Sequence, residues 1–136
     1  MANRHDARIL ALKVLYEVDL SHHQMEKVFE QQLVSVQLEP ESESFARALV
    51  SGSIRQQLEA DELIHRLAPN YPVSQMAAID RNVLRLAIYE VLHDNNVPVR
   101  VAINEAVELA KVFGSDSSAK FINGVLSSVA TLVQRS

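Results

Sequence analysis

The sequence contains no cysteine, no tryptophan and only three glycines, and the shortages of cysteine and glycine narrow what the protein can be. Without cysteine, the chain has no disulfide, no thiolate ligand for a metal and no cysteine nucleophile. Gly52, Gly114 and Gly124 do not form the Asn-Gly, Asp-Gly or Gly-Gly pairs that close tight hairpins. An all-β or Rossmann-like α/β domain needs more turn glycines, so we predict an all-α fold.

Long apolar runs are also absent. No run approaches the roughly 18 residues of a membrane span, and residues 1–6 lack the apolar core of a signal peptide. We therefore expect no membrane segment and a cytoplasmic location. Apolar residues nevertheless make up 48% of the 136 residues, which is enough for a hydrophobic core. This length and composition predict one domain over residues 1–136.

The motifs of common enzymes are missing as well. The chain has no P-loop, no Gly-x-Gly-x-x-Gly and no Gly-x-Ser-x-Gly. None of the five histidines belongs to a His-Glu-x-x-His pair, and no acidic residue completes a zinc-like cluster at useful spacing. We therefore predict a protein that works by binding, with no catalytic residue, no metal and no cofactor.

The net charge of −4 is unevenly distributed along the chain. The segment from Glu17 to Glu62 holds ten acidic and three basic residues, whereas the remainder holds seven acidic and ten basic residues. A chain with one acidic flank can still present a basic face elsewhere. The overall acidity therefore does not exclude a nucleic-acid ligand, although scattered surface charge would give the same composition.

Apolar residues recur at helical spacing along most of the chain. Asn3 is the expected N-cap of the first helix, and Gly52 is expected to bend or divide a long third stretch. Two prolines make residues 68–72 a loop. Gly114 is expected as a left-handed C-cap, and Gly124 as a site of close helix packing. The predicted helices cover about 4–20, 24–36, 42–67, 79–93, 98–114 and 116–134.

Two segments carry binding signals. Arg4 and Arg8 are one helical turn apart and could grip phosphates, although such arginines are commonly just solvated. The segment Asp116–Phe121 sets hydroxyls, the Lys120 cation and an aromatic ring around a helix N-terminus, which attracts phosphate. Because Ile122, Val125 and Leu126 form a buried stripe without it, we predict that the Phe121 ring is partly exposed and can stack an RNA base. The alternative is that Phe121 belongs to the core.

Two blocks of the sequence make it recognisable. Near the start, Ala7-Arg8 is followed by Leu15-Tyr16. From residue 79 onward the chain reads IDRNVLRLAIYE, then Val97-Pro98, VAINEAVELAK at 101–111 and KFINGVL at 120–126. With these blocks the chain resembles the NusB family of bacterial transcription antitermination factors. The resemblance covers nearly the whole chain, although residues 21–78 match only in pattern.

The resemblance implies a compact all-helical fold of about seven helices in two small bundles. It also implies binding of boxA RNA together with NusE, a small-subunit ribosomal protein, within the RNA polymerase antitermination complex of ribosomal RNA operons. The RNA-binding residues that it implies are Arg4, Arg8, Asp116, Lys120 and Phe121. The acidic residue implied to face NusE is Asp80. The family's arginine run is interrupted here by His5 and Asp6, which should weaken RNA binding by the free protein.

Two other functions remain compatible with the sequence. One is an RNA-binding domain of this kind related to that of ribosomal RNA methyltransferases, although the missing Gly-rich cofactor motif disfavours an intact enzyme. The other is a helical protein-interaction module with no role in RNA binding. The sequence also leaves open whether the free protein is a monomer or a homodimer.

Overall fold

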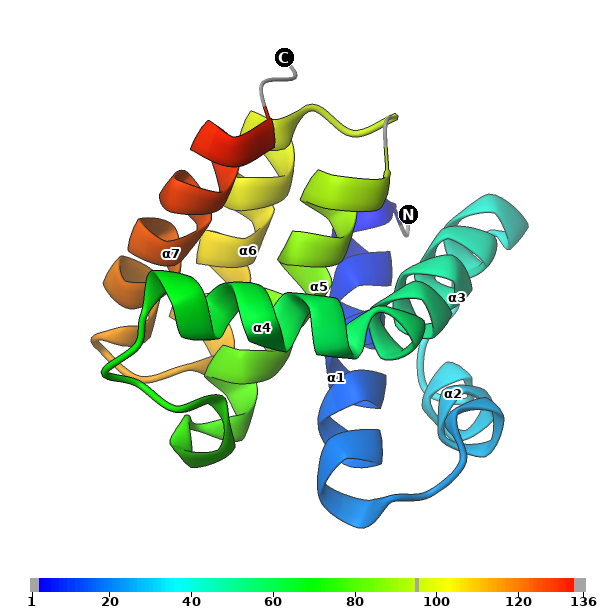
Figure 1. Ribbon diagram of the computed structural model, residues 1–136. Coiled ribbons are helices and arrows are strands. Elements are labelled where there is room, and N and C mark those ends of the chain that lie inside the picture. The colour runs from blue at the N-terminus through cyan, green and yellow to red at the C-terminus, as the bar shows by residue number, and fades with distance from the viewer. Residues whose placement is uncertain (1–2, 95, 134–136) are drawn as a thin grey trace. The chain divides into compact units, whose positions relative to one another are not determined.

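The computed structural model describes residues 3–94 and 96–133, and over these ranges it contains helices and no strand. The all-α prediction is therefore confirmed. Within the same ranges, no helix combines the length and the apolar character needed to cross a bilayer. The elements, labelled in Figure 1, are α1 (Arg4–Ser21), α2 (Met25–Leu33), α3 (Pro40–Arg55), α4 (Gln57–Leu67), the 3₁₀ helix η1 (Val73–Gln75), α5 (Ala78–His93), α6 (Val99–Phe113) and α7 (Ser118–Val133).

The chain divides into two compact units between Arg55 and Gln56. Unit 1 holds α1–α3 and unit 2 holds α4–α7, as expected for two small bundles. The predicted helical stretch 42–67 is divided into α3 and α4, but not at Gly52, which is buried inside α3. The helix ends three residues later, and Gln56 leaves helical geometry with φ −102° and ψ 19°.

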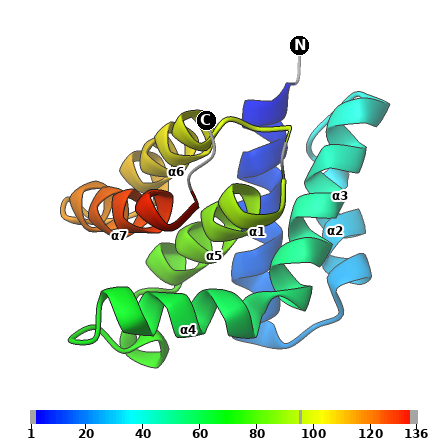
Figure 2. The ribbon, with the colours of Figure 1, turned by 45° about the horizontal axis from the view of Figure 1, so that its top comes forward.

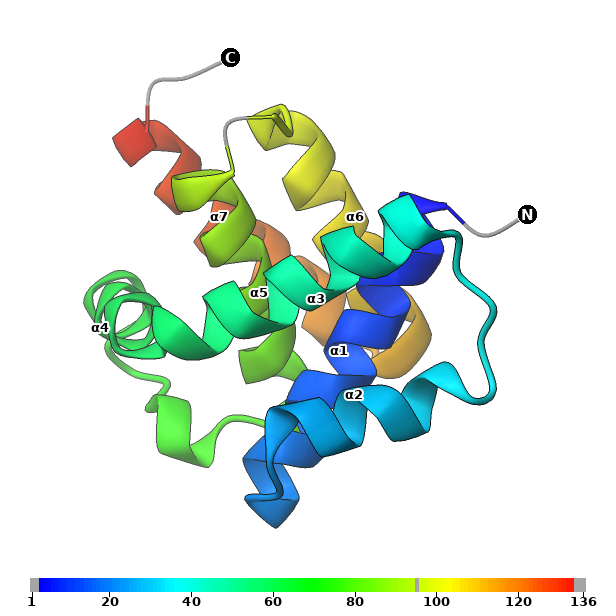
Figure 3. The same cartoon turned by 90° about the vertical axis from the view of Figure 1, so that its right-hand side faces the viewer.

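In unit 1, α1 packs against both α2 and α3, and α2 also contacts α3 (Figures 2 and 3). The N-cap prediction is confirmed, because Asn3 Oδ1 accepts a hydrogen bond from the Asp6 amide at 3.2 Å. Ala7 and Ala11 are fully buried, as their spacing predicts. The C-cap residue that follows α1 is His22, which lies in the left-handed region with φ 62°. This cap was not predicted from the sequence.

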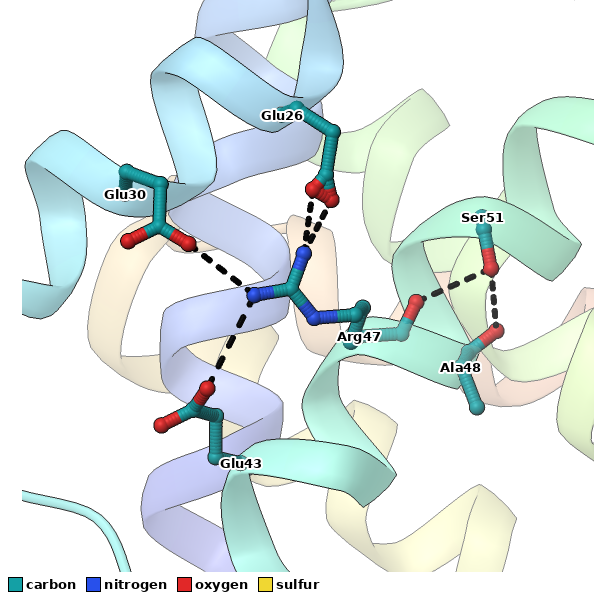
Figure 4. Close-up of polar contacts among 6 residues, drawn as sticks. All are labelled: Glu26, Glu30, Glu43, Arg47, Ala48 and Ser51. Atoms are coloured by element: carbon teal, nitrogen blue, oxygen red, sulfur yellow. Dashed lines mark hydrogen bonds and ion pairs between the residues drawn. The ribbon is translucent and has the colours of Figure 1, made fainter. Parts of the chain in front are cut away.

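A single arginine ties α2 to α3 (Figure 4). Arg47 of α3 pairs with Glu26 and, at 3.1 Å, with Glu30 of α2, and it lies 3.7 Å from Glu43 of its own helix. Its guanidinium carbon also lies 4.4 Å from the centroid of the Phe29 ring, which the guanidinium covers. Burial lowers the pKa of Arg47, but the hydrogen bonds to Glu30 and Glu26 and the attraction of their negative charges together raise it above its usual value. Part of the acidic excess of unit 1 is thus neutralised locally.

In unit 2, α5, α6 and α7 pack against one another, and α4 crosses them against α5 and α7 (Figure 1). A partly buried ion pair joins α4 to α5: the Arg85 Nε and Nη2 atoms donate to the two Asp61 carboxylate oxygens at 2.9 and 3.0 Å. Because the guanidinium and the carboxylate meet through two hydrogen bonds, the pair is held in one orientation as well as by the attraction of opposite charges. It holds α4, and with it the loop that follows, against the bundle.

Two glycines differ from their predicted roles. Gly114 ends α6 in extended geometry, with φ −95° and ψ −169°, so it is not a left-handed cap. Its lack of a side chain matters instead because a Cβ there would lie 2.6 Å from Ser118 Oγ and 2.8 Å from the Ala110 carbonyl oxygen. A Cβ on Gly124 would meet no atom within 4 Å, so this glycine does not serve close helix packing within the described chain.

Candidate nucleic-acid and partner interface

The two predicted arginines of α1 meet over one aromatic ring in unit 1. The guanidinium carbon of Arg4 lies 4.3 Å from the Phe45 ring centroid, and that of Arg8 lies 5.1 Å from it. Helical spacing places the two side chains one turn apart, and Phe45 comes from α3. Stacking on a ring face uses the flat side of a guanidinium and leaves its N–H edge for other acceptors. Sequence reasoning did not single out Phe45, so its role as a support for the two cations was missed.

Arg4 and Arg8 differ in exposure. Arg4 is exposed and has no partner among the described residues other than the Phe45 ring. Arg8 is only 4% exposed, although the sequence suggested that both arginines could grip phosphates. A buried arginine contributes packing through its stem as well as charge. The pair therefore presents one accessible cation, with a second held beneath the surface next to it.

The start of α7 is shaped by the serines of a short loop. The helix begins at Ser118, two residues later than predicted. The Ser118 hydroxyl accepts a hydrogen bond from the Ser115 amide at 2.9 Å, and the residue is 1% exposed. This hydroxyl therefore serves the loop and is not presented to a ligand. Asp116 and Ser117 are exposed, so their side chains can face an external partner.

Lys120 and Phe121 follow in the first turn of α7. Lys120 is exposed and forms no ion pair within the described residues. Phe121 is half-buried while Ile122, Val125 and Leu126 are buried, so its predicted partial exposure is confirmed. Its ring contacts Tyr71, with centroids 5.1 Å apart and planes inclined by 57°. We did not single out Tyr71 in the sequence, although an aromatic residue beside a proline in a loop was a usable signal.

Asp80 lies in the first turn of α5, where a carboxylate interacts favourably with the helix dipole. Its side chain is half-buried, and its Oδ1 atom is buried with no hydrogen-bond partner. The neighbouring Arg81 points its Nη1 atom at the Val73 and Ser74 carbonyl oxygens, both at 3.4 Å. Arg81 thus fixes the 3₁₀ turn, and Asp80 keeps an acceptor that the fold leaves unused.

The predicted site residues form two groups and one separate position. Arg4 and Arg8 come together in unit 1, Lys120 and Phe121 come together in unit 2, and Asp80 stands at the start of α5. Each group pairs a cation with an aromatic ring, which suits an anion joined to a flat, unsaturated ring system. Over residues 3–94 and 96–133, no three His, Asp or Glu side chains are grouped to hold a metal.

A family profile described as the NusB family matches residues 5–131. Among curated relatives, the "Transcription antitermination protein NusB" of Dehalococcoides mccartyi (strain ATCC BAA-2266 / KCTC 15142 / 195) is 49% identical over 128 residues, which are 94% of this chain and 90% of the relative. The protein of the same name from Chloroflexus aggregans is 46% identical over 132 residues, covering 96% of this chain and 88% of the relative.

Two solved structures share the fold. A structure described as T. maritima NusB matches with a TM-score of 0.88 and 30% identity, covering 96% of this chain and 92% of that one. A chain from a structure described as antitermination factors NusB and NusE in complex with dsRNA matches with a TM-score of 0.86 and 25% identity. That match covers 95% of this chain and 96% of the other.

Proposed function

Because the chain belongs to the NusB family, we propose that it is a transcription antitermination factor that binds boxA RNA together with NusE. In this role it suppresses premature termination in ribosomal RNA operons as part of the RNA polymerase antitermination complex. The observation that carries the proposal is the family match over residues 5–131. A similar fold in a structure of NusB, NusE and RNA supports both partners. The role requires no bond to be made or broken.

The proposed RNA contacts combine charge with stacking. Arg4 binds phosphate through a guanidinium edge that the Phe45 ring keeps in place, and the buried Arg8 adds its positive charge beneath the same surface. Lys120 adds a phosphate contact, and the half-exposed Phe121 ring stacks an unpaired base. The exposed Asp116 carboxylate accepts hydrogen bonds from base amino groups or ribose hydroxyls. We propose that residues 1–136 act as one RNA-binding domain.

The proposed NusE contact centres on Asp80. Its buried, unpartnered Oδ1 leaves the carboxylate incompletely satisfied in the free chain, and a basic partner that docks over the start of α5 would stabilise the negative charge. NusE would then enlarge the surface offered to RNA. Two ligands that share a composite surface strengthen each other's binding by the same factor.

A gel-shift titration tests the proposal. The chain is titrated onto a boxA oligonucleotide with and without NusE, and onto a scrambled oligonucleotide of the same composition. We expect weak binding by the chain alone, because His5 and Asp6 interrupt the arginine run, and stronger boxA binding with NusE. Equal affinity for boxA and scrambled RNA, with NusE present, would remove the specificity for boxA. No binding of either RNA would make the chain a helical protein-interaction module without an RNA role.

A further inference from the structure

A small open groove in unit 2 lies between the loop after α4 and the first two turns of α7. It has a volume of about 340 Å³, within the range of about 300–1,000 Å³ that is usual for small-molecule sites. The α7 side supplies Lys120, Phe121 and Gly124, and the loop side supplies Pro69, Asn70 and Tyr71. The groove therefore joins the predicted Phe121 contact to a loop that the family resemblance did not assign.

Two aromatic rings line this groove. Tyr71 is 58% exposed, so its ring is accessible to a ligand in the groove. Its ring meets Phe121 in a tilted arrangement, with centroids 5.1 Å apart and planes 57° apart. Because the planes are inclined, the rings do not cover each other face to face. A flat third ring can therefore lie against Tyr71 while its edge meets Phe121.

Gly124 gives an independent reason to expect a ligand here. A glycine inside a helix is destabilising relative to alanine, so it calls for a reason. Its backbone has no positive φ, and a Cβ there would meet no atom within 4 Å. Neither backbone geometry nor packing within the described chain requires a glycine at this position. An external group lying over the helix backbone would require it.

We propose that Tyr71, Phe121 and Gly124 form a binding site for one unpaired RNA base, with Tyr71 as a stacking residue. Lys120 borders the same groove and has no ion pair among the described residues, so it is placed to bind the phosphate that accompanies the base. A base needs a flat surface, and its phosphate needs a nearby cation; the groove supplies both. This inference rests on the proposed RNA binding and adds a residue to it.

The absence of tryptophan allows a direct test. The chain has three tyrosines, and Tyr16→Phe with Tyr89→Phe leaves Tyr71 as the only strong intrinsic fluorophore. In the presence of NusE lacking tyrosine and tryptophan, boxA RNA should quench Tyr71 emission as the complex forms. The matched control, Tyr71→Phe with Tyr89→Phe, reports Tyr16 and corrects for light absorbed by the RNA. We expect the Tyr71 signal to fall well beyond this control.

Affinity provides the second readout. Tyr71→Ala should weaken boxA binding roughly 5- to 150-fold, and Tyr71→Phe should bind nearly as the parent does. Normal affinity of Tyr71→Ala together with unquenched Tyr71 emission would overturn the inference while RNA binding itself stands. Quenching by NusE alone, with no further change on adding RNA, would assign the groove to protein and also overturn it. Failure of the parent to bind boxA would instead overturn the proposed function.

Discussion

The difference in burial between Arg4 and Arg8 predicts that two neighbouring arginines fail in different ways when cut to alanine. Arg4 is exposed and stacks on the Phe45 ring, so its loss should lower the free energy of unfolding by about 0.5–1 kcal/mol. Arg8 is 4% exposed and stacks on the same ring, so its loss also removes buried packing. We expect Arg8→Ala to cost about 2–3 kcal/mol.

Both variants should weaken RNA binding, and the salt dependence separates charge from folding. Each lost phosphate contact on single-stranded RNA should flatten the plot of log affinity against log salt by about 0.7. Urea unfolding gives the stability of each variant, and fluorescence anisotropy with boxA RNA from 50 to 200 mM salt gives the slope. Arg66→Ala, which removes an exposed positive charge from α4, is the matched control.

The reasoning fails if Arg4→Ala leaves the salt slope equal to that of the parent and of Arg66→Ala. It also fails if Arg8→Ala is as stable as Arg4→Ala, because the buried guanidinium would then contribute nothing to folding. In the sequence the two arginines look equivalent, and only the burial of Arg8 gives its removal a cost in stability.

Three further predictions follow from the contacts. Asp80→Asn, which keeps the size of the half-buried side chain, should weaken NusE binding in calorimetry and leave boxA binding by the chain alone unchanged; equal NusE affinity would remove Asp80 from the partner surface. Gly114→Ala should lower the free energy of unfolding by about 1–3 kcal/mol because its Cβ would collide with Ser118, whereas Gly124→Ala should raise it by about 0.5–1 kcal/mol; urea titrations that reverse this order would contradict the account. Arg47→Ala should cost about 1–2 kcal/mol, since it leaves Glu26, Glu30 and Glu43 unneutralised and uncovers Phe29; the same loss in the exposed-arginine control Arg55→Ala would show that the cluster is not responsible.

Sequence reasoning succeeded where one local signal decides the structure. The Asn3 cap depends on a single hydrogen bond to the Asp6 amide, and the two prolines exclude a helix at residues 69–72. The buried stripe of Ile122, Val125 and Leu126 follows from helical spacing alone. These features do not require knowledge of which element packs on which, so a pattern of residue types was sufficient to predict them.

Sequence reasoning failed where a residue's role depends on a distant neighbour. Gly114 follows a helix and so suggests a left-handed cap, but the position of Ser118 decides its role. The burial of Arg8 and the support from Phe45 arise only once α1 lies against α3. The Tyr71–Phe121 contact joins residues fifty positions apart along the chain. None of these contacts produces a periodic pattern of residue types in the sequence, so the structure was needed to find them.

The central claim is that the chain promotes read-through by acting on boxA together with NusE. The most direct measurement is the fraction of transcripts that pass a terminator placed downstream of boxA, in a reaction with RNA polymerase, its elongation factors and NusE, with and without the chain. We predict that the chain raises read-through on this template and not on one with scrambled boxA, and that omitting NusE removes most of the effect. Equal read-through with and without the chain, or an equal increase on the scrambled template, would contradict the account.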